Sequence, residues 1–142
     1  LIPVVFISIV VGYGTAVQAT PVFGWLVEQV LSLDMNPYLL TFVAVNLLAG
    51  MTANGTGGVT LFMENFGATI LGNPAINVGA LHRIAAISGA GFDSLPHNGA
   101  IAFQLSVFKL SYKDGYFQQF MMSVLVNLLA GLLAVLMAVV LF

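Results

Sequence analysis

The chain has 142 residues, of which 60% are hydrophobic and 6% are charged, and its formal net charge is −2. A soluble globular domain carries about a quarter charged residues, so this composition, with a mean hydropathy of +1.06, excludes an ordinary soluble domain. The small net charge and the lack of a basic run give no reason to expect a nucleic-acid partner. Without cysteine, these residues form neither disulfides nor thiolate metal sites. The composition therefore favours a protein whose partner is the lipid bilayer.

Residues 1–20 form the first apolar run, which is long enough to cross a bilayer because a crossing helix needs about 20 residues. The run lacks the charged start of a signal peptide, so we expect a membrane span. Since the chain begins inside this run, we expect it to be a fragment of a longer membrane protein. Residues 22–33 are expected to form an interfacial helix, because Trp25 and Glu28 suit the membrane surface. A short core helix is the alternative for these residues.

Two short apolar segments, residues 38–50 and 59–71, flank a polar, glycine-rich loop at residues 51–58 (MTANGTGG). A helix of this length rises only about 20 Å, which falls short of the ~30 Å hydrocarbon core. We therefore predict that residues 37–72 form a re-entrant helical hairpin with its tip near the membrane midplane. Two full spans joined by a surface loop are the alternative.

A second polar stretch, residues 88–99 (SGAGFDSLPHNG), interrupts the next apolar region. Irregular backbone at membrane depth is tolerated only where it is buried in protein or lines a cavity. We predict that residues 76–110 form one span that is unwound at this stretch, with Pro96 in the first turn of its second half. A polar loop at residues 111–115 precedes the last predicted span, residues 116–142. The expected fold class is thus an all-α, polytopic membrane protein.

The two polar loops would each place a helix N-terminus inside the membrane, where free N–H groups and the helix dipole favour an anion. Hydroxyl and amide side chains in both loops would add contacts to a carboxylate or to sugar-like hydroxyl groups, and glycines would let the backbone approach a ligand closely. The alternative is structural, because Gly-rich loops also allow tight helix crossings. The expected substrate-binding residues are Thr52, Asn54, Gly55, Thr56, Gly57, Ser94, His97, Asn98 and Gly99.

Residues 81–84 (LHRI) and 91–100 (GFDSLPHNGA) resemble the signature of GntP-family permeases, the gluconate-type proton symporters of the ion-transporter superfamily. In the subgroup that the chain resembles, the second motif is GLDTLPHNGA, so Phe92 and Ser94 are departures from it. The hairpin tip of that subgroup resembles TGSASGG, whereas residues 52–58 here are TANGTGG, with Asn54 and Thr56 at the two serine positions. These exchanges keep hydrogen-bonding capacity but change side-chain volume, which leaves the substrate open.

The resemblance covers nearly the whole chain and implies that it is the C-terminal half of such a permease. It implies one inverted repeat of the superfamily fold, in the order span, interfacial helix, hairpin, broken span and final span. The missing N-terminal repeat of the same chain would supply the matching hairpin and broken helix. The resemblance also implies a homodimer in the cell membrane, in bacteria the inner membrane, that carries gluconate or another hydroxycarboxylate together with a proton.

Three residues are candidates for carrying the coupled proton. Asp93 lies at the predicted unwound centre, where removal from water favours a protonated carboxyl group, although it could simply cap the following helix. His97 lies four residues later and would be its partner, although a core histidine is often only hydrogen-bonded. Glu64 lies in the second hairpin arm, where an ionised carboxylate needs a partner or water. Arg83 would attract an anionic substrate, pair with Glu64, or contact a lipid headgroup.

The leading hypothesis is secondary active transport, as proton-coupled symport of a small organic anion. A channel-forming or structural membrane subunit is the alternative, but a channel would show continuous polar faces rather than two polar breaks. An intramembrane hydrolase that uses Ser94 or His97 with Asp93 is disfavoured, because no base is placed beside the hydroxyl group. No metal-ligand spacing, P-loop or dinucleotide fingerprint occurs, so we expect no enzyme, metal or cofactor.

Overall fold

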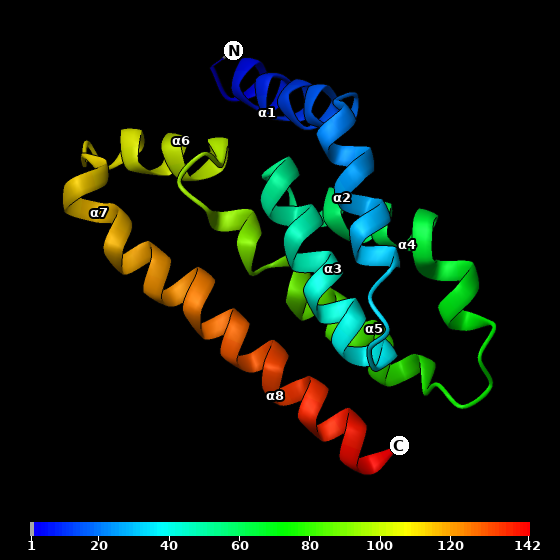
Figure 1. Cartoon of the computed structure of the whole chain (residues 1–142). Helices are drawn as coiled ribbons and strands as arrows, with labels where there is room; N and C mark the ends of the chain where they lie inside the picture. The colour runs from blue at the N-terminus through cyan, green and yellow to red at the C-terminus, as the bar shows by residue number, and fades with distance from the viewer. Residues whose placement is uncertain (1) are drawn as a thin grey trace.

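The computed structural model describes the backbone of residues 2–142 and their side chains, except those at positions 2, 3, 6, 7, 10, 11, 14 and 31. This part of the chain is all-helical and contains no strand, as the sequence predicts (Figure 1). A 3₁₀ turn at Phe92–Ser94 lies between α5 and α6, and a π-helical segment at Phe120–Leu125 joins α7 to α8. The α-helices are α1 (Ile2–Gln18), α2 (Pro21–Leu31), α3 (Pro37–Thr52), α4 (Gly55–Leu71), α5 (Val78–Gly89), α6 (Gly99–Val107), α7 (Tyr112–Gln119) and α8 (Val126–Leu141).

Polar N-caps explain where most of these helices begin. In each case a side-chain oxygen accepts a hydrogen bond from a backbone N–H of the first turn, which satisfies a donor that the helix itself leaves free. Pro21 and Pro37 occupy the first positions of α2 and α3, where the missing N–H of proline is not needed. The capping residues are Thr20, Asn36, Asn54, Asn77, Asn98 and Ser111.

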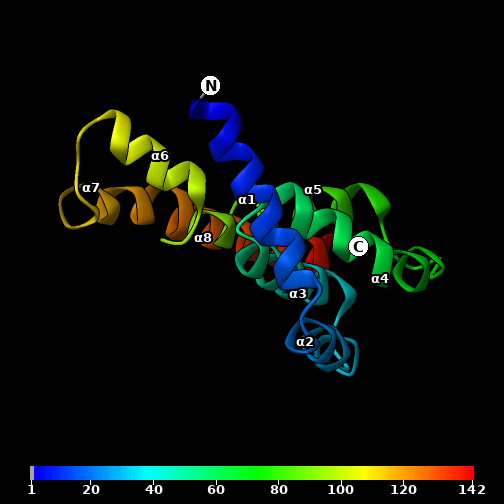
Figure 2. The ribbon, with the colours of Figure 1, turned by 90° about the horizontal axis from the view of Figure 1, so that it is seen from above.

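The central helix of the molecule is α3. Both α4 and α5 pack on it, and α8 packs against α5 and α3. Leu48, Phe62 and Ile84 are among the largest fully buried side chains, and the rings of Phe62 and Phe66 stack with their centroids 5.2 Å apart. α1 crosses over α3 and also contacts α6 (Figure 2). The apolar core therefore lies between α3, α4 and α5.

Glycine lets the two arms of the α3–α4 hairpin approach each other closely. A Cβ atom at Gly58 would lie 2.6 Å from the backbone nitrogen of Ala49, a separation that side chains do not tolerate. Ala53, which ends α3, has a left-handed conformation with a φ of 51°, and this turns the chain into α4. The hairpin tip, residues 52–55, is thus a tight reversal between two closely packed arms.

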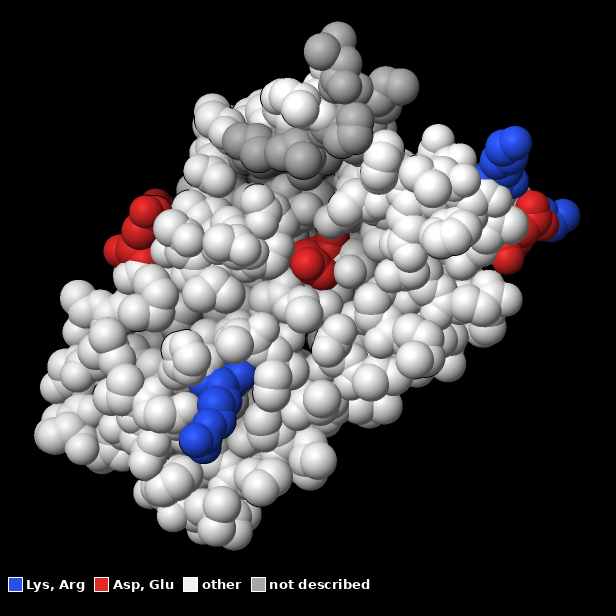
Figure 3. Space-filling view, turned by 180° about the vertical axis from the view of Figure 1, so that it is seen from behind, with Lys and Arg blue, Asp and Glu red and all other residues white. Residues whose placement is uncertain are grey.

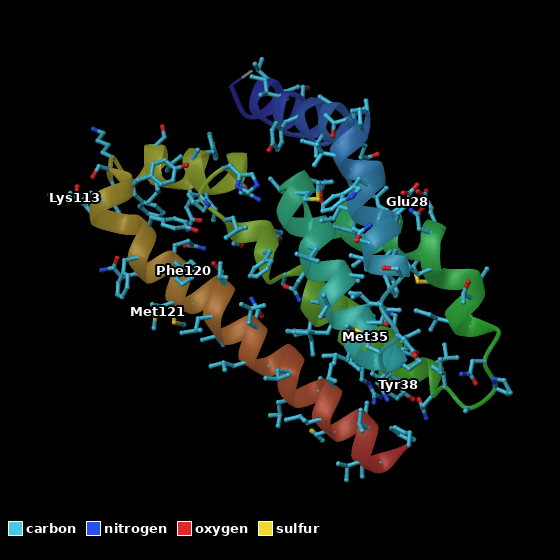
Figure 4. The ribbon with its side chains drawn as sticks, viewed as in Figure 1. Glu28, Met35, Tyr38, Lys113, Phe120 and Met121 are labelled. Carbon is cyan, nitrogen blue, oxygen red and sulfur yellow. The ribbon has the colours of Figure 1, made fainter. Side chains whose placement is uncertain are left out.

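The start of α3 and the start of α5 lie together at one end of the molecule. The N–H of Asn77, just before α5, donates to the hydroxyl oxygen of Tyr38, at a distance of 2.8 Å. From this end α5 runs antiparallel to α8 (Figure 1). Figure 4 shows Met35 and Tyr38 towards this end and Lys113 at the opposite one. The hairpin tip and the end of α5 therefore point away from the end that carries Tyr38.

One helix in the described residues is long and apolar enough to cross a membrane. It is the continuous helix Tyr112–Leu141, with 30 residues and a mean hydropathy of 2.8 in its most apolar window. Lys113 and Asp114 lie in its first turn, and no charged residue follows them in the helix. The helix α3 is also apolar, but its 16 residues rise about 24 Å, less than the ~30 Å hydrocarbon core.

Three details differ from the sequence prediction. The last helix begins at Tyr112 rather than at residue 116, because the Ser111 hydroxyl oxygen caps it by accepting from the N–H of Asp114. Pro96 lies before α6 and not in its first turn, since Asn98 is the cap of that helix. α6 lies beside α7 and is not in line with α5 (Figure 1), so the chain changes direction after the unwound stretch.

Gly58→Ala is expected to destabilise the protein by about 1–3 kcal/mol, because the new methyl group would force the hairpin arms apart. Gly24→Ala is the matched control. No atom lies within 4 Å of a Cβ built at Gly24, so the better helix propensity of alanine should leave stability unchanged or raise it by up to about 1 kcal/mol. The measurement is detergent-induced unfolding of both purified variants. Equal stability of the Gly58→Ala variant and the unchanged protein would contradict the close crossing.

Candidate functional site

The chain between α5 and α6, residues 90–98, is the irregular segment that we call the break. Its backbone groups are bound by side chains from other helices. Asn127 in α8 donates from its side-chain nitrogen to the carbonyl oxygen of Ala90, at 3.1 Å. Asn46 in α3 accepts from the N–H of Phe92 at 3.3 Å and is itself buried. The break is thus held from two sides by asparagines that lie in otherwise apolar helices.

Two tyrosines continue this pattern along the last helix. The hydroxyl of Tyr116 donates to the carbonyl oxygen of Ser94 at 3.2 Å, and the hydroxyl of Tyr112 donates to that of Pro96 at 2.9 Å. The Tyr112 contact is exposed and the Tyr116 contact is partly buried, and each gives a backbone carbonyl of the break a hydrogen-bond partner outside a helix. These side chains therefore allow the chain to remain non-helical here.

The break also binds the hairpin tip directly. The side-chain nitrogen of Asn98 donates to the carbonyl oxygen of Ala53 at 2.9 Å and also to that of Asp93. The Nε2 atom of His97 lies 2.7 Å from the carbonyl oxygen of Gly50, near the end of α3, to which it donates when it carries the ring proton. The two polar loops that the sequence singles out are therefore joined by hydrogen bonds.

Backbone also meets backbone where the two loops join. A Cβ atom at Gly55, the first residue of α4, would lie 2.3 Å from the carbonyl oxygen of Gly89, the last residue of α5. A side chain at position 55 would therefore separate α4 from α5. At position 91, a Cβ atom would lie 2.1 Å from the side-chain oxygen of Asn46. This packing alone explains the glycines at positions 55 and 91.

An open cavity of about 390 Å³ lies beside this junction. Its lining combines the first turn of α4, the last turn of α5 and the start of the break. Asp93 contributes the only ionisable side chain of this lining, and the Ser94 hydroxyl donates to Oδ1 of the Asp93 carboxyl group at 2.8 Å. The lining residues are Gly55, Thr56, Val59, Ala86, Gly89, Ala90 and Asp93.

A second, apolar cavity of about 260 Å³ continues from the first between α4 and α5. The two share Val59 and Ala86, and His82 is the one ionisable residue in the lining of the second. Together they form a groove that is polar at the hairpin tip and apolar farther along. A ligand in this groove would meet the carboxyl group of Asp93 and the hydroxyl of Thr56 at the end beside the hairpin tip.

The structure divides the predicted substrate-binding residues into two sets. Gly55 and Thr56 line the cavity together with Asp93. Thr52 is buried and its hydroxyl donates to the carbonyl oxygen of Leu48 at 2.8 Å, within its own helix. The remaining predicted residues do not line this cavity either: Asn54, Gly57, Ser94, His97, Asn98 and Gly99.

Both loop asparagines use their side chains to build the site. The side-chain oxygen of Asn54 accepts from the N–H of Gly57 at 3.1 Å, which caps α4. The side-chain oxygen of Asn98 accepts from the N–H groups of Ala100 and Ile101, which caps α6, while its nitrogen binds the two carbonyl groups named above. These contacts use the side-chain oxygen of Asn54 and both polar side-chain atoms of Asn98.

The predicted pairings of His97 with Asp93 and of Arg83 with Glu64 do not form among the described residues. The ring of His97 contacts Gly50 and lies 6.0 Å from the ring of Tyr13 between centroids, whereas the carboxyl group of Asp93 is bound by Ser94. Glu64 and Arg83 are both exposed and form no ion pair with each other. On the face shown in Figure 3, charged side chains are few, and acidic and basic ones adjoin only at one end of the molecule.

Four residues that position the site were not predicted as site residues: Asn46, Asn127, Tyr112 and Tyr116. The two asparagines carry a signal in the sequence, because an isolated Asn in an apolar helix needs a partner. The tyrosines carry no such signal, since Tyr is common at membrane interfaces for other reasons. No group of three or more His, Cys, Asp or Glu side chains in residues 2–142 is placed to hold a metal ion.

The comparisons with known proteins point to transport. The chain is 29% identical over 108 residues to a protein of Bacillus subtilis (strain 168) named "Uncharacterized transporter YxjC". The matched region covers 74% of this chain and 23% of that protein, so the chain spans about a quarter of this relative. No protein-family model matches the chain. No solved structure matches it significantly either.

Asn98→Ala is expected to destabilise the protein by about 2 kcal/mol or more, because it removes the cap of α6 and leaves two backbone carbonyl groups without partners. Asn98→Asp keeps the capping oxygen but loses the donor, so it should also destabilise. Asn65→Ala is the control, since Asn65 is exposed and bonds only within its own helix. Detergent-induced unfolding measures all three. Equal stability of the Asn98→Ala and Asn65→Ala variants would refute the hydrogen bonds by which Asn98 joins the break to the hairpin tip.

Proposed function

We propose that this chain is part of a membrane transporter that moves a small organic anion together with a proton. The observation that carries the proposal is the cavity in which the carboxyl group of Asp93 faces the first turn of α4. The similarity to a relative named a transporter supports the transport role. The resemblance of residues 81–84 and 91–100 to GntP permeases supports the choice of an organic anion and a proton.

The proposed membrane placement follows from the last helix. Asn127 lies 13 residues after Asp114, about 20 Å along the helix axis. If the charged first turn lies among the headgroups, Asn127 and the Ala90 carbonyl that it binds lie inside the ~30 Å hydrocarbon core. The break and the joined hairpin tip would then also lie at membrane depth. We propose on this basis that α3 and α4 form a re-entrant hairpin.

The remaining helices complete the proposed repeat. α1 and the helix Tyr112–Leu141 would be its outer spans, α2 would lie at the interface, and α5, the break and α6 would form the broken span. The rest of the full-length protein would supply a second repeat, and two copies would form a dimer in the cell membrane. The open side of the cavity at Asp93 would then be closed by the second repeat.

Electrostatics gives a reason why proton and anion would move together. An ionised Asp93 repels an anion in the same cavity, and in a low-dielectric site this repulsion is strong. Protonation of Asp93 removes the repulsion and leaves the helix N-terminus and the Thr56 hydroxyl to bind the anion. Because coupling of two binding sites is reciprocal, the anion also raises the affinity of Asp93 for its proton. Symport follows if only the empty and doubly occupied states move across the membrane.

Asp93→Asn is expected to abolish uphill uptake of labelled gluconate driven by a proton gradient, because the amide cannot exchange a proton. Exchange of gluconate down its gradient should persist, since the rest of the cavity is kept. The assay uses proteoliposomes that hold the full-length protein. Glu64→Gln is the matched control and should transport normally, because Glu64 is exposed and does not line the cavity.

Two results would count against this assignment. If the Asp93→Asn protein accumulated gluconate against its gradient, another residue would have to carry the coupled proton. Loss of exchange together with loss of accumulation would show that Asp93 is needed for binding and not for coupling. If the unchanged protein does not transport gluconate, the same two assays with other hydroxycarboxylates test which anion is transported.

A further inference from the structure

Arg83 is an exposed cation on an otherwise apolar part of the molecule. It lines a groove of about 170 Å³ between α5 and α8, whose other lining residues are all apolar, among them Ala134, Met137 and Ala138. In the described residues the guanidinium group has no ion-pair, hydrogen-bond or ring-stacking partner. A cation beside hydrocarbon needs a counter-charge or water, so this arrangement points to a ligand.

The position of the groove along the last helix sets its depth. Met137 lies 23 residues after Asp114, about 35 Å along the helix axis. That rise slightly exceeds the ~30 Å hydrocarbon core, and a tilt of about 20° shortens it only a little. With Asp114 at one boundary of the bilayer, the residues beside Arg83 reach the opposite boundary, where lipid phosphate groups lie.

We propose that Arg83 and the α5–α8 groove bind an anionic phospholipid, with the guanidinium group on the lipid phosphate and an acyl chain along the groove. A guanidinium group offers paired N–H donors that fit phosphate oxygens, and basic pockets between membrane helices bind anionic headgroups. Ala134 and Ala138 are small, which leaves room for a methylene chain. This site rests on the proposed membrane placement, but not on the transported substrate or its coupling ion.

The groove is separate from the proposed transport site. It shares no lining residue with the cavity at Asp93. The substrate anion and the lipid phosphate are therefore expected to bind independently. A change at Arg83 should alter lipid binding and leave the binding of a soluble anion at Asp93 intact.

Native mass spectrometry of the purified full-length protein tests the proposal. The probes are phosphatidylglycerol and phosphatidylcholine with identical acyl chains. The unchanged protein should retain phosphatidylglycerol preferentially, and Arg83→Gln should weaken this retention about tenfold, because a charge-assisted hydrogen-bond pair is lost. Arg83→Lys should retain part of the preference. Lys113→Gln is the matched control and should bind like the unchanged protein, since Lys113 lies at the opposite end of the last helix (Figure 4).

A second variant tests the groove without removing the charge. Ala134→Leu should fill part of the groove and also weaken phosphatidylglycerol retention, while detergent-induced unfolding reports whether the variant stays folded. The proposal is overturned if Arg83→Gln retains phosphatidylglycerol as well as the unchanged protein does, as it would if the rest of the full-length chain covered the groove. It is also overturned if inorganic phosphate displaces the lipid fully, because the site would then bind free phosphate.

Lipid retention and gluconate transport are measured in separate assays. Gluconate uptake by the Arg83→Gln protein in phosphatidylcholine vesicles should equal that of the unchanged protein. Loss of uptake there would assign Arg83 to the substrate path and overturn the lipid site. Failure of gluconate transport in both proteins, with lipid preference intact, would instead contradict only the proposed substrate.

Discussion

A chain that leaves the helical conformation needs new hydrogen-bond partners for its backbone groups, and the rest of this structure depends on how the break meets that requirement. Asn46 and Asn127 bind backbone groups of the break from α3 and α8, and two tyrosines of the last helix bind two more. Each of these partners fixes the break against a different part of the fold. The break is therefore a defined structure and not a loose connection.

This requirement also explains why the site lies where it does. Asn98 binds the hairpin tip, the backbone of Asp93 and the first turn of α6 with one side chain. The hairpin tip is thereby placed against the break, and the contact between Gly55 and Gly89 brings α4 to the end of α5. The cavity lies beside this junction. The carboxyl group of Asp93 belongs to its lining because α5 ends a few residues earlier and the break carries Asp93 next to the first turn of α4.

Much of the helical pattern could be predicted from the sequence, because apolar runs, asparagine caps and prolines at helix starts are local signals. The two glycine-rich loops could be identified for the same reason. The roles of individual loop side chains could not. The side-chain oxygens of Asn54 and Asn98 cap helices, which is a local contact, but the donation from Asn98 to Ala53 joins segments far apart in the chain and leaves no local signal.

The same limit applies to the partners of charged residues. His97 is close to Asp93 in sequence, yet its ring turns to the carbonyl group of Gly50, which α3 leaves free at its end. The same holds near the change of direction before α6, where the break contacts Tyr112 and Tyr116 of the last helix. Contacts of this kind join residues far apart in the chain and leave no periodic pattern in the sequence.

The placement of the hairpin and the break inside a membrane is tested most directly by the sidedness of single cysteines. Asp34→Cys, Pro74→Cys and Lys113→Cys are introduced one at a time into the full-length protein, in a background without other cysteines. A membrane-impermeant maleimide is then applied to sealed vesicles of known orientation. The cysteines at positions 34 and 74 should be labelled from the same face and the one at position 113 from the opposite face. Labelling of positions 34 and 74 from opposite faces would contradict the re-entrant hairpin and the transport site built on it.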